Sequence, residues 1–282
     1  MLAIAGMHDG SSQVLTNPHL AENSRQLSYY HNSCAAALLN ERLSRPPLKT
    51  VDRNAIWTTA NLLGNMVSFS MEPRDHGLAW PLSSSTSSLD WLDMHKGMAV
   101  LSNLCAPSDP GGIFYELNQH PAYSILKNKW VVDDRDGVDG IPSQFVTLCD
   151  LSPASNARNC PYHASVRALA QIWDMESTVY TAFRFLTFIS LMPSEMKALL
   201  ASKDARALLM LAYWYTKMFH VHYWWHQRAV VGCAAICIYL MRHHYSDPLI
   251  MDMLHYPLSK LGGIDAGVSA LKMLTDAVDS HS

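Results

Sequence analysis

Several features that mark common classes of protein are scarce or missing in this sequence. Charged residues make up only 16% of it, whereas about a quarter is usual, and Lys and Arg form no basic cluster. Such clusters bind nucleic acids because they neutralise the backbone phosphates. We therefore expect no direct nucleic-acid binding by this chain. The apolar share of 49% points instead to a large buried core.

The cysteines lack the spacing of a metal or redox motif. They are Cys34, Cys105, Cys149, Cys160, Cys233 and Cys237. Because there is no CxxC pair, the sequence predicts neither a zinc cluster nor a thioredoxin-type site. The chain also lacks a basic segment before an apolar run at its start, which a secretory signal requires. We expect a reducing compartment, cytoplasmic or nuclear, in which the thiols are small core residues.

Standard catalytic motifs are missing as well. There is no GxSxG elbow, no phosphate-binding glycine loop and no dinucleotide fingerprint, so we expect no cofactor. Four acidic residues surround Gly137, namely Asp133, Asp134, Asp136 and Asp139. In a calcium loop centred on Gly137, however, Val132 and Ser143 would occupy positions that need acidic ligands. We interpret the segment as a solvated acidic turn.

All-α is the only fold class that the apolar periodicity supports, because no alternating run is long enough for a sheet. Predicted helices cover residues 1–8, 18–43, 52–71, 89–104 and 164–191, and others follow Pro193, the cap pair Asp247–Pro248, and the break at Gly262–Gly263, over 265–280. Asp52 is the predicted cap of the third helix. Turn-forming residues make 106–160 an irregular insertion with one short helix. We expect a single domain over residues 1–282.

The most apolar stretch runs from Asp204 to His244. Between Ala205 and Phe219 only three polar or charged residues interrupt it, which leaves no solvent-facing side and predicts a central helix. The second apolar block, Ala229–Met241, is too short to cross a bilayer as a helix. We therefore expect a central pair of hydrophobic helices in a soluble protein without a membrane span.

Aromatic residues crowd the junction between these two apolar blocks. They are Tyr213, Trp214, Tyr215, Phe219, Tyr223, Trp224 and Trp225. Rings with polar groups pack densely but leave irregular gaps, so we expect an apolar pocket here that orients a small molecule through a few hydrogen bonds. All of them except Tyr215 are our candidate ligand contacts, although core packing also explains each ring by itself.

Two histidines at the junction raise the question of a metal. His222 and His226 are four residues apart and would share one face of a helix. No Glu occupies the position of a catalytic base beside them. The sequence therefore favours histidines that are hydrogen-bonded in the core, and we predict no metal.

Several tracts together resemble the regulatory domain of fungal six-cysteine zinc-cluster transcription factors, in particular the sterol uptake control proteins. In order along the chain they are LAIAGMH, LSYYHNSCAAALLNERLS, IWTTANLLGNMVSF, AWPL, SLDWLDMHKGMAVL, ARALLMLAYWYTKMFHVHYWWHQRAVV and HYPLSKLGG. The resemblance implies an all-α domain that senses a sterol or a similar lipid in an apolar cavity. The zinc cluster and basic linker of that family are absent from this sequence, and we also expect its first helices to be missing before Met1.

Two functional hypotheses follow. The first is a regulator-like domain that binds a sterol, terpenoid or polyketide in fungal lipid or secondary metabolism; a homodimer is compatible with it. The alternative is an enzyme that folds a terpenoid or polyketide for a cofactor-independent, Diels–Alder-type or other pericyclic cyclisation, which needs orientation and hydrogen bonds rather than a metal. In that case the predicted donors to a polarised carbonyl are His222, His226, Tyr215 and Arg228.

Overall fold

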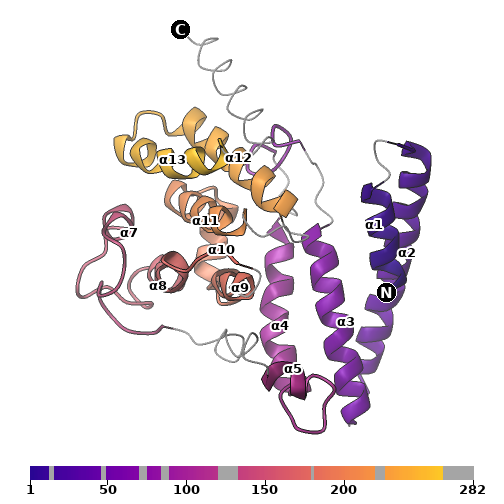
Figure 1. Cartoon of the computed structure of the whole chain (residues 1–282). Helices are drawn as coiled ribbons and strands as arrows, with labels where there is room; N and C mark the ends of the chain where they lie inside the picture. The colour runs from indigo at the N-terminus through magenta and orange to yellow at the C-terminus, as the bar shows by residue number, and fades with distance from the viewer. Residues whose placement is uncertain are drawn as a thin grey trace. The chain divides into compact units, whose positions relative to one another are not determined.

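The computed structural model describes residues 1–12, 16–45, 49–69, 75–83, 89–119, 133–178, 181–219 and 226–262. All regular secondary structure in these ranges is helical, and none of it is strand (Figure 1). The predicted all-α class is confirmed. The predicted helix over 265–280 lies outside the described residues.

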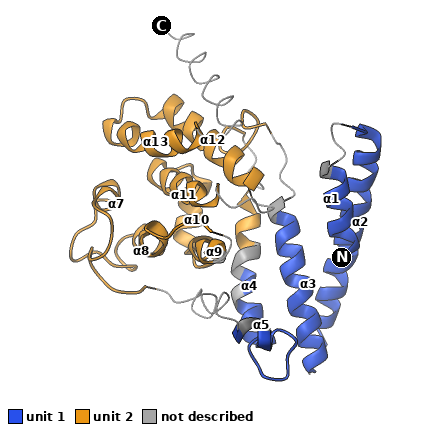
Figure 2. Cartoon of the chain, in the orientation of Figure 1, with its two compact units in different colours: residues 1–70, 97–124 blue, residues 71–96, 125–282 orange. Residues whose placement is uncertain are grey.

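The chain divides into two compact units, where the sequence led us to expect one domain (Figure 2). Unit 1 comprises Met1–Ser70 and Gly97–Ser124, and unit 2 comprises Met71–Lys96 and Ile125–Ser282. Helix α4, Trp91–Cys105, contributes its first residues to unit 2 and the rest to unit 1. The helices that belong entirely to unit 1 are α1 (Leu2–Ser12), α2 (Pro18–Leu43), α3 (Thr50–Phe69) and α5 (Tyr115–Gln119).

Helices α1 and α2 of unit 1 form a hairpin whose contact face includes several small residues. A Cβ atom at Gly6 would lie 2.9 Å from the backbone oxygen of Ser24, so only glycine permits this close approach. The Ser28 hydroxyl donates to the backbone oxygen of Ala3 at 2.7 Å, across the same interface. Helix α2 begins as predicted at Pro18, where the Asn17 side chain accepts from the Leu20 amide.

An ion pair ties the end of α2 to the start of α3. Arg42 donates from Nε to Asp52 Oδ1 at 2.9 Å and from a terminal guanidinium nitrogen to Oδ2. Asp52 is not the cap residue that we predicted, because α3 begins two residues earlier, at Thr50. Instead it accepts from the backbone amide of Lys49 at 3.0 Å, as the acidic residue of a capping box does.

The core of unit 1 lies between α3 and the neighbouring helices. Ile56 and Trp57 of α3 and Cys105 of α4 are buried together. Partly buried apolar side chains pack against them, namely Leu39, Leu43, Met98, Leu101 and Phe114. The unit therefore joins the α2–α3 region to the later part of α4 through one apolar cluster.

Unit 2 contains most of the long buried helices. The helices that belong entirely to unit 2 are α7 (Ser143–Leu148), α8 (His163–Trp173), α9 (Ala182–Ser190), α10 (Ser194–Ala201), α11 (Ala205–Met218), α12 (His226–His243) and α13 (Pro248–Leu261). Helix α11 packs against α12 and α13, and nearly every side chain of α11 is buried. Asp204 caps α11 by accepting from the Ala207 amide at 2.9 Å.

The prediction of one continuous helix over 164–191 is wrong, because the chain forms two helices there, α8 and α9. Hydroxyl groups compete for the backbone between them: the Thr178 amide donates to Thr181 Oγ1 at 2.8 Å, and the Thr181 amide donates to Thr178 Oγ1 at 3.2 Å. Lys217 of α11 donates to the backbone oxygens of Trp173 and Met175 at the end of α8. This ammonium group stabilises the end of α8 and favours termination there.

The predicted helix starts after Pro193 and at Pro248 are confirmed, whereas the insertion needs correction. Helix α10 starts after Pro193, and α13 starts at Pro248, where Asp247 accepts from the Leu249 and Ile250 amides. The described parts of 106–160 contain two short helices, α5 and α7, rather than one, and they belong to different units. None of the helices in the described ranges combines the length and the apolar character that crossing a membrane requires.

Candidate ligand pocket

A pocket of about 330 Å³ lies in unit 2, where α4 begins, α9 ends and α10 follows. Its lining residues are Leu92, Asp93, Ile189, Met192, Pro193, Ser194, Lys197, Ala198 and Ala201. Leu92, Ile189 and Met192 are buried and provide an apolar wall, while Ala198 and Ala201 are exposed. Small-molecule sites begin at about 300 Å³, so the volume of this pocket lies at the lower end of their range.

The short turn between α9 and α10 shapes this pocket. Pro193 is the residue before α10, with an extended conformation (φ −64°, ψ 157°), and a residue before proline avoids the helical region. Because Met192 precedes this proline, the helix cannot continue through it, and α9 ends at Ser190, four positions before α10 begins at Ser194. Because of this reversal, Ile189 at the end of α9 and Lys197 in α10 line the same space.

The charged part of the lining is an ion pair. Lys197 donates from Nζ to Asp93 Oδ2, which joins α10 to the first turn of α4. The Asp93 side chain is largely exposed and that of Lys197 about one-third exposed, so the pair contributes little to stability. Either partner can exchange this contact for a polar group of a ligand at low cost.

Sequence reasoning missed this pair. Asp93 and Lys197 are separated by 104 positions, and neither belongs to a local motif. Each is a single charged residue in a helical pattern, which is the ordinary composition of a helix surface. Only the path of the chain through α9 and α10 brings them together.

The described rings of the aromatic junction lie on two sides of α11. Trp214 stacks between Trp91 of α4 and Phe188 of α9, with ring centroids 6.1 and 5.9 Å away, and donates from Nε1 to the Phe185 backbone oxygen at 2.7 Å. Tyr213 stacks on Tyr256 of α13 at 5.0 Å. Its hydroxyl donates to the Met253 backbone oxygen at 2.8 Å.

These rings lie close to the pocket along the chain but do not line it. Trp91 and Phe188 directly precede the lining residues Leu92 and Ile189. Tyr213, Trp214 and Phe219 are buried and absent from the lining, so their predicted ligand contact stays a prediction. His222, Tyr223, Trp224 and Trp225 lie outside the described residues.

Two of the predicted catalytic donors lie close to each other in the interior. A Cβ atom at Gly232 would lie 2.9 Å from the Tyr215 hydroxyl, and Arg228 precedes Gly232 by one turn of α12. Burial raises the pKa of Tyr215 above its usual value, and the positive charge of Arg228 partly opposes this rise. Burial also lowers the pKa of Arg228, whose guanidinium lies 4.9 Å from the Trp91 ring centroid.

His226, the third described donor, begins α12. Its Nδ1 lies 2.9 Å from the backbone oxygen of Phe219, so this ring nitrogen carries the proton and donates. Across the described ranges, no three His, Cys, Asp or Glu side chains gather as a metal-binding group.

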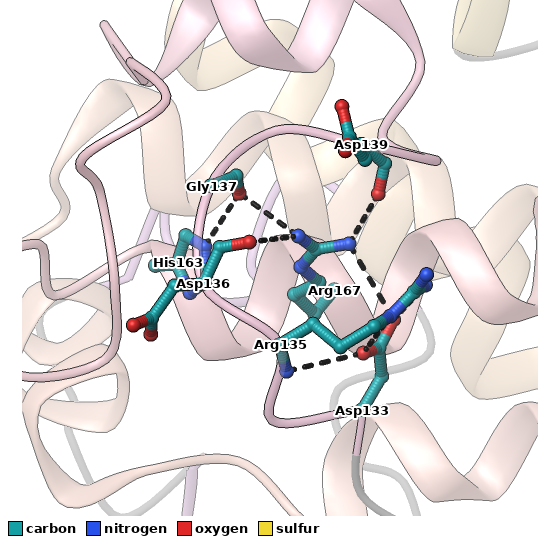
Figure 3. A network of polar contacts seen from close by, with 7 residues as sticks. All are labelled: Asp133, Arg135, Asp136, Gly137, Asp139, His163 and Arg167. Atoms are coloured by element: carbon teal, nitrogen blue, oxygen red, sulfur yellow. Dashed lines mark hydrogen bonds and ion pairs between the residues drawn. The ribbon is translucent and has the colours of Figure 1, made fainter.

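The acidic segment before α7 is held by a buried arginine rather than left in solvent (Figure 3). Arg167 of α8 donates from its terminal nitrogens to the backbone oxygens of Asp136, Gly137 and Asp139. It also forms an ion pair with Asp133 at 3.5 Å. The predicted solvated turn is therefore correct for the exposed Asp134, Asp136 and Asp139 side chains but wrong for Asp133.

Two further contacts complete this network. Arg135 donates from Nε and a terminal nitrogen to the two Asp133 carboxylate oxygens at 2.8 Å each, which lowers the pKa of Asp133. His163 Nε2 lies 2.9 Å from the backbone oxygen of Gly137. The Arg167 guanidinium thus satisfies these oxygens, and we assign the network a structural role.

Comparisons with known proteins found no match for this chain among family models, curated proteins or solved structures.

Proposed function

We propose that this chain is a ligand-binding helical domain of the regulatory type, and that its ligand is a small apolar molecule with one polar group. The observation that carries the proposal is the pocket of about 330 Å³ with one buried apolar wall, formed by Leu92, Ile189 and Met192, and one exchangeable ion pair. Apolar walls supply affinity, and a single polar contact fixes orientation.

The size of the pocket narrows the ligand class. A volume of about 330 Å³ is near the lower limit for small-molecule sites. It suits a compact terpenoid or polyketide, held against the buried wall and partly open to solvent at Ala198 and Ala201, better than a sterol. The all-α fold and the ordered series of tracts described above support a regulatory role, in which an occupied pocket stabilises the α4–α9–α10 arrangement and thereby changes the affinity for a partner.

A binding measurement with a matched variant tests this proposal. Ala198 lines the pocket and is exposed, so Ala198→Trp should fill the pocket without disturbing the core. We expect farnesol to raise the melting temperature of the wild type and of Ala55→Trp, a control at an exposed position of α3, but not that of Ala198→Trp. Equal responses of all three proteins would show that farnesol does not bind in this pocket.

The cyclase hypothesis remains a second candidate because of the Tyr215–Arg228 pair. Two hydrogen-bond donors from different helices lie close together in an apolar interior, where they can stabilise a developing oxyanion more strongly than in water. The test is incubation of the purified protein with linear terpenoid and polyketide precursors, followed by mass spectrometry of the products. If a product forms, Arg228→Met and His226→Phe should each abolish it; turnover that survives both changes would remove these residues from the mechanism.

A further inference from the structure

Helix α2 of unit 1 carries several large apolar side chains on the side that faces solvent, apart from Leu39 and Leu43, which pack against the core. Its contact with α1 uses small residues, such as the buried Ala21 and Ser28. The exposed large residues include Leu20 (45% exposed), Leu27 (55%), Tyr30 (64%) and Leu38 (65%). Isolated exposed apolar residues are common, but several on one helix face indicate an interaction surface.

These residues follow the spacing of a helix–helix seam. Six positions alternate in steps of four and three residues: Leu20, Ser24, Leu27, His31, Cys34 and Leu38. This is the spacing of the heptad by which two helices pack side chains between one another, and leucine occupies three of the six positions. We call these six residues the α2 seam; Ser24, His31 and Cys34 are only partly buried, so the seam is accessible along its length.

We propose that the α2 seam binds the same seam of a second copy of this chain, with the two helices antiparallel about a twofold axis. In this register Leu20 faces Leu38 of the second copy, Ser24 faces Cys34, and Leu27 faces His31. Each pair occurs twice, once on either side of the axis, as an isologous interface requires. Each facing pair then joins a residue from one core position of the heptad (Leu20, Leu27 or Cys34) with a residue from the other (Ser24, His31 or Leu38). Tyr30 lies beside the twofold axis, next to Tyr30 of the second copy.

The charges and the area of the seam agree with a second copy as its partner. No Asp, Glu, Lys or Arg lies in the seam, so no like charges meet across the axis, and antiparallel helix dipoles attract each other. Leu20 and Leu38 are about 27 Å apart along the helix axis. A helix pair of this length buries roughly 500 Å² per copy, which is close to the lower limit of about 1,000 Å² in total for a specific interface. The dimer should therefore be weak, with a Kd on the order of 10 µM.

Sedimentation equilibrium of the full chain tests the association, at protein concentrations from about 1 to about 100 µM. We expect the wild type to shift from monomer to dimer over this range. Leu27→Lys, which places a charge at the centre of the seam, should raise the Kd at least about tenfold. Val51→Lys, the same kind of change at an exposed position of α3, should leave the Kd unchanged.

Two outcomes would overturn the proposal at this stage. A wild type that stays monomeric at the highest concentration would mean that another protein, or another part of this chain, covers the seam. A dimer that persists in Leu27→Lys would place the interface elsewhere.

Disulfide trapping tests the register, because Cys34 lies in the seam. In the antiparallel register Cys34 faces Ser24 of the second copy, so Ser24→Cys should yield a disulfide-linked dimer on mild oxidation. The double variant Ser24→Cys/Cys34→Ser should not. An efficient Cys34–Cys34 crosslink in the wild type would contradict this geometry, since it requires either parallel helices or an antiparallel register centred on Cys34.

Discussion

Arg167 is the residue on which the conformation of the segment before α7 depends most directly. Its side chain is 1% exposed, and its guanidinium binds three backbone oxygens and the Asp133 carboxylate. Backbone oxygens inside a protein need hydrogen-bond donors. A planar guanidinium can satisfy several at once, which the ammonium group of a lysine cannot.

We predict that Arg167→Met lowers the free energy of unfolding of unit 2 by about 3 kcal/mol, because it leaves Asp133 and the backbone oxygens without their donor. Urea unfolding monitored by circular dichroism measures the change. Arg158→Met, at an exposed position of the same loop region, is the control and should alter the free energy by less than about 0.5 kcal/mol. A loss of similar size in both variants would show that the network contributes nothing specific.

At the scale of elements, side chains from distant positions decide where helices begin and end. The end of α8 is held by Lys217 of α11, whose Nζ reaches two backbone oxygens there. The start of α3 is held by Asp52, which pairs with Arg42 of α2 and also accepts from the Lys49 amide. Both contacts connect elements as well as terminating them.

The ion pair between α2 and α3 gives a prediction for acid pH. The hydrogen bond from Arg42 lowers the pKa of Asp52 from 3.8 to about 2. A carboxylate with a lowered pKa stabilises the folded state above its unfolded pKa and loses this effect as the pH falls through its folded pKa. The melting temperatures of the wild type and Asp52→Asn should therefore differ at neutral pH and converge between about pH 4 and about pH 2.

Glu116→Gln, at an exposed position of α5, is the control for this measurement. Its melting temperature should follow that of the wild type at every pH. A difference between the wild type and Asp52→Asn that stays constant down to the lowest pH would mean that the Arg42 pair does not stabilise unit 1.

At the scale of the whole molecule, each unit has its own buried cluster. In unit 1 the cluster includes Ile56, Trp57 and Cys105. In unit 2 the buried faces of α11 and α12 dominate. Regions with separate cores open separately when each core is stable by itself.

We predict that destabilising one unit leaves the other protected from hydrogen exchange. Arg167→Met should speed amide exchange in residues 133–148 and in α8, while α1 and α3 keep the wild-type rate. Asp52→Asn should speed exchange at the α2–α3 connection, while α11 is unchanged. Mass spectrometry of peptides after deuteration measures both, and faster exchange throughout the chain in either variant would show that the units unfold together.

The helical class and several helix boundaries could be predicted because they depend on local information. Proline, capping residues and apolar periodicity act within a few positions along the chain, and they placed the starts of α2, α10 and α13 correctly. The break between α8 and α9 could not be predicted in the same way. It depends on local hydroxyl contacts and on Lys217, which is more than forty positions away from Trp173.

In the candidate site, too, some features follow from local sequence and others depend on contacts between distant residues. The sequence by itself determined that the interior is apolar and rich in rings, because composition and periodicity are properties of the chain. Tertiary structure alone decided that Trp214 stacks in the core and that Asp93 and Lys197 meet beside a pocket. The physical reason is that a contact between residues 104 positions apart depends on how helices pack and turn, and no local sequence pattern encodes that packing.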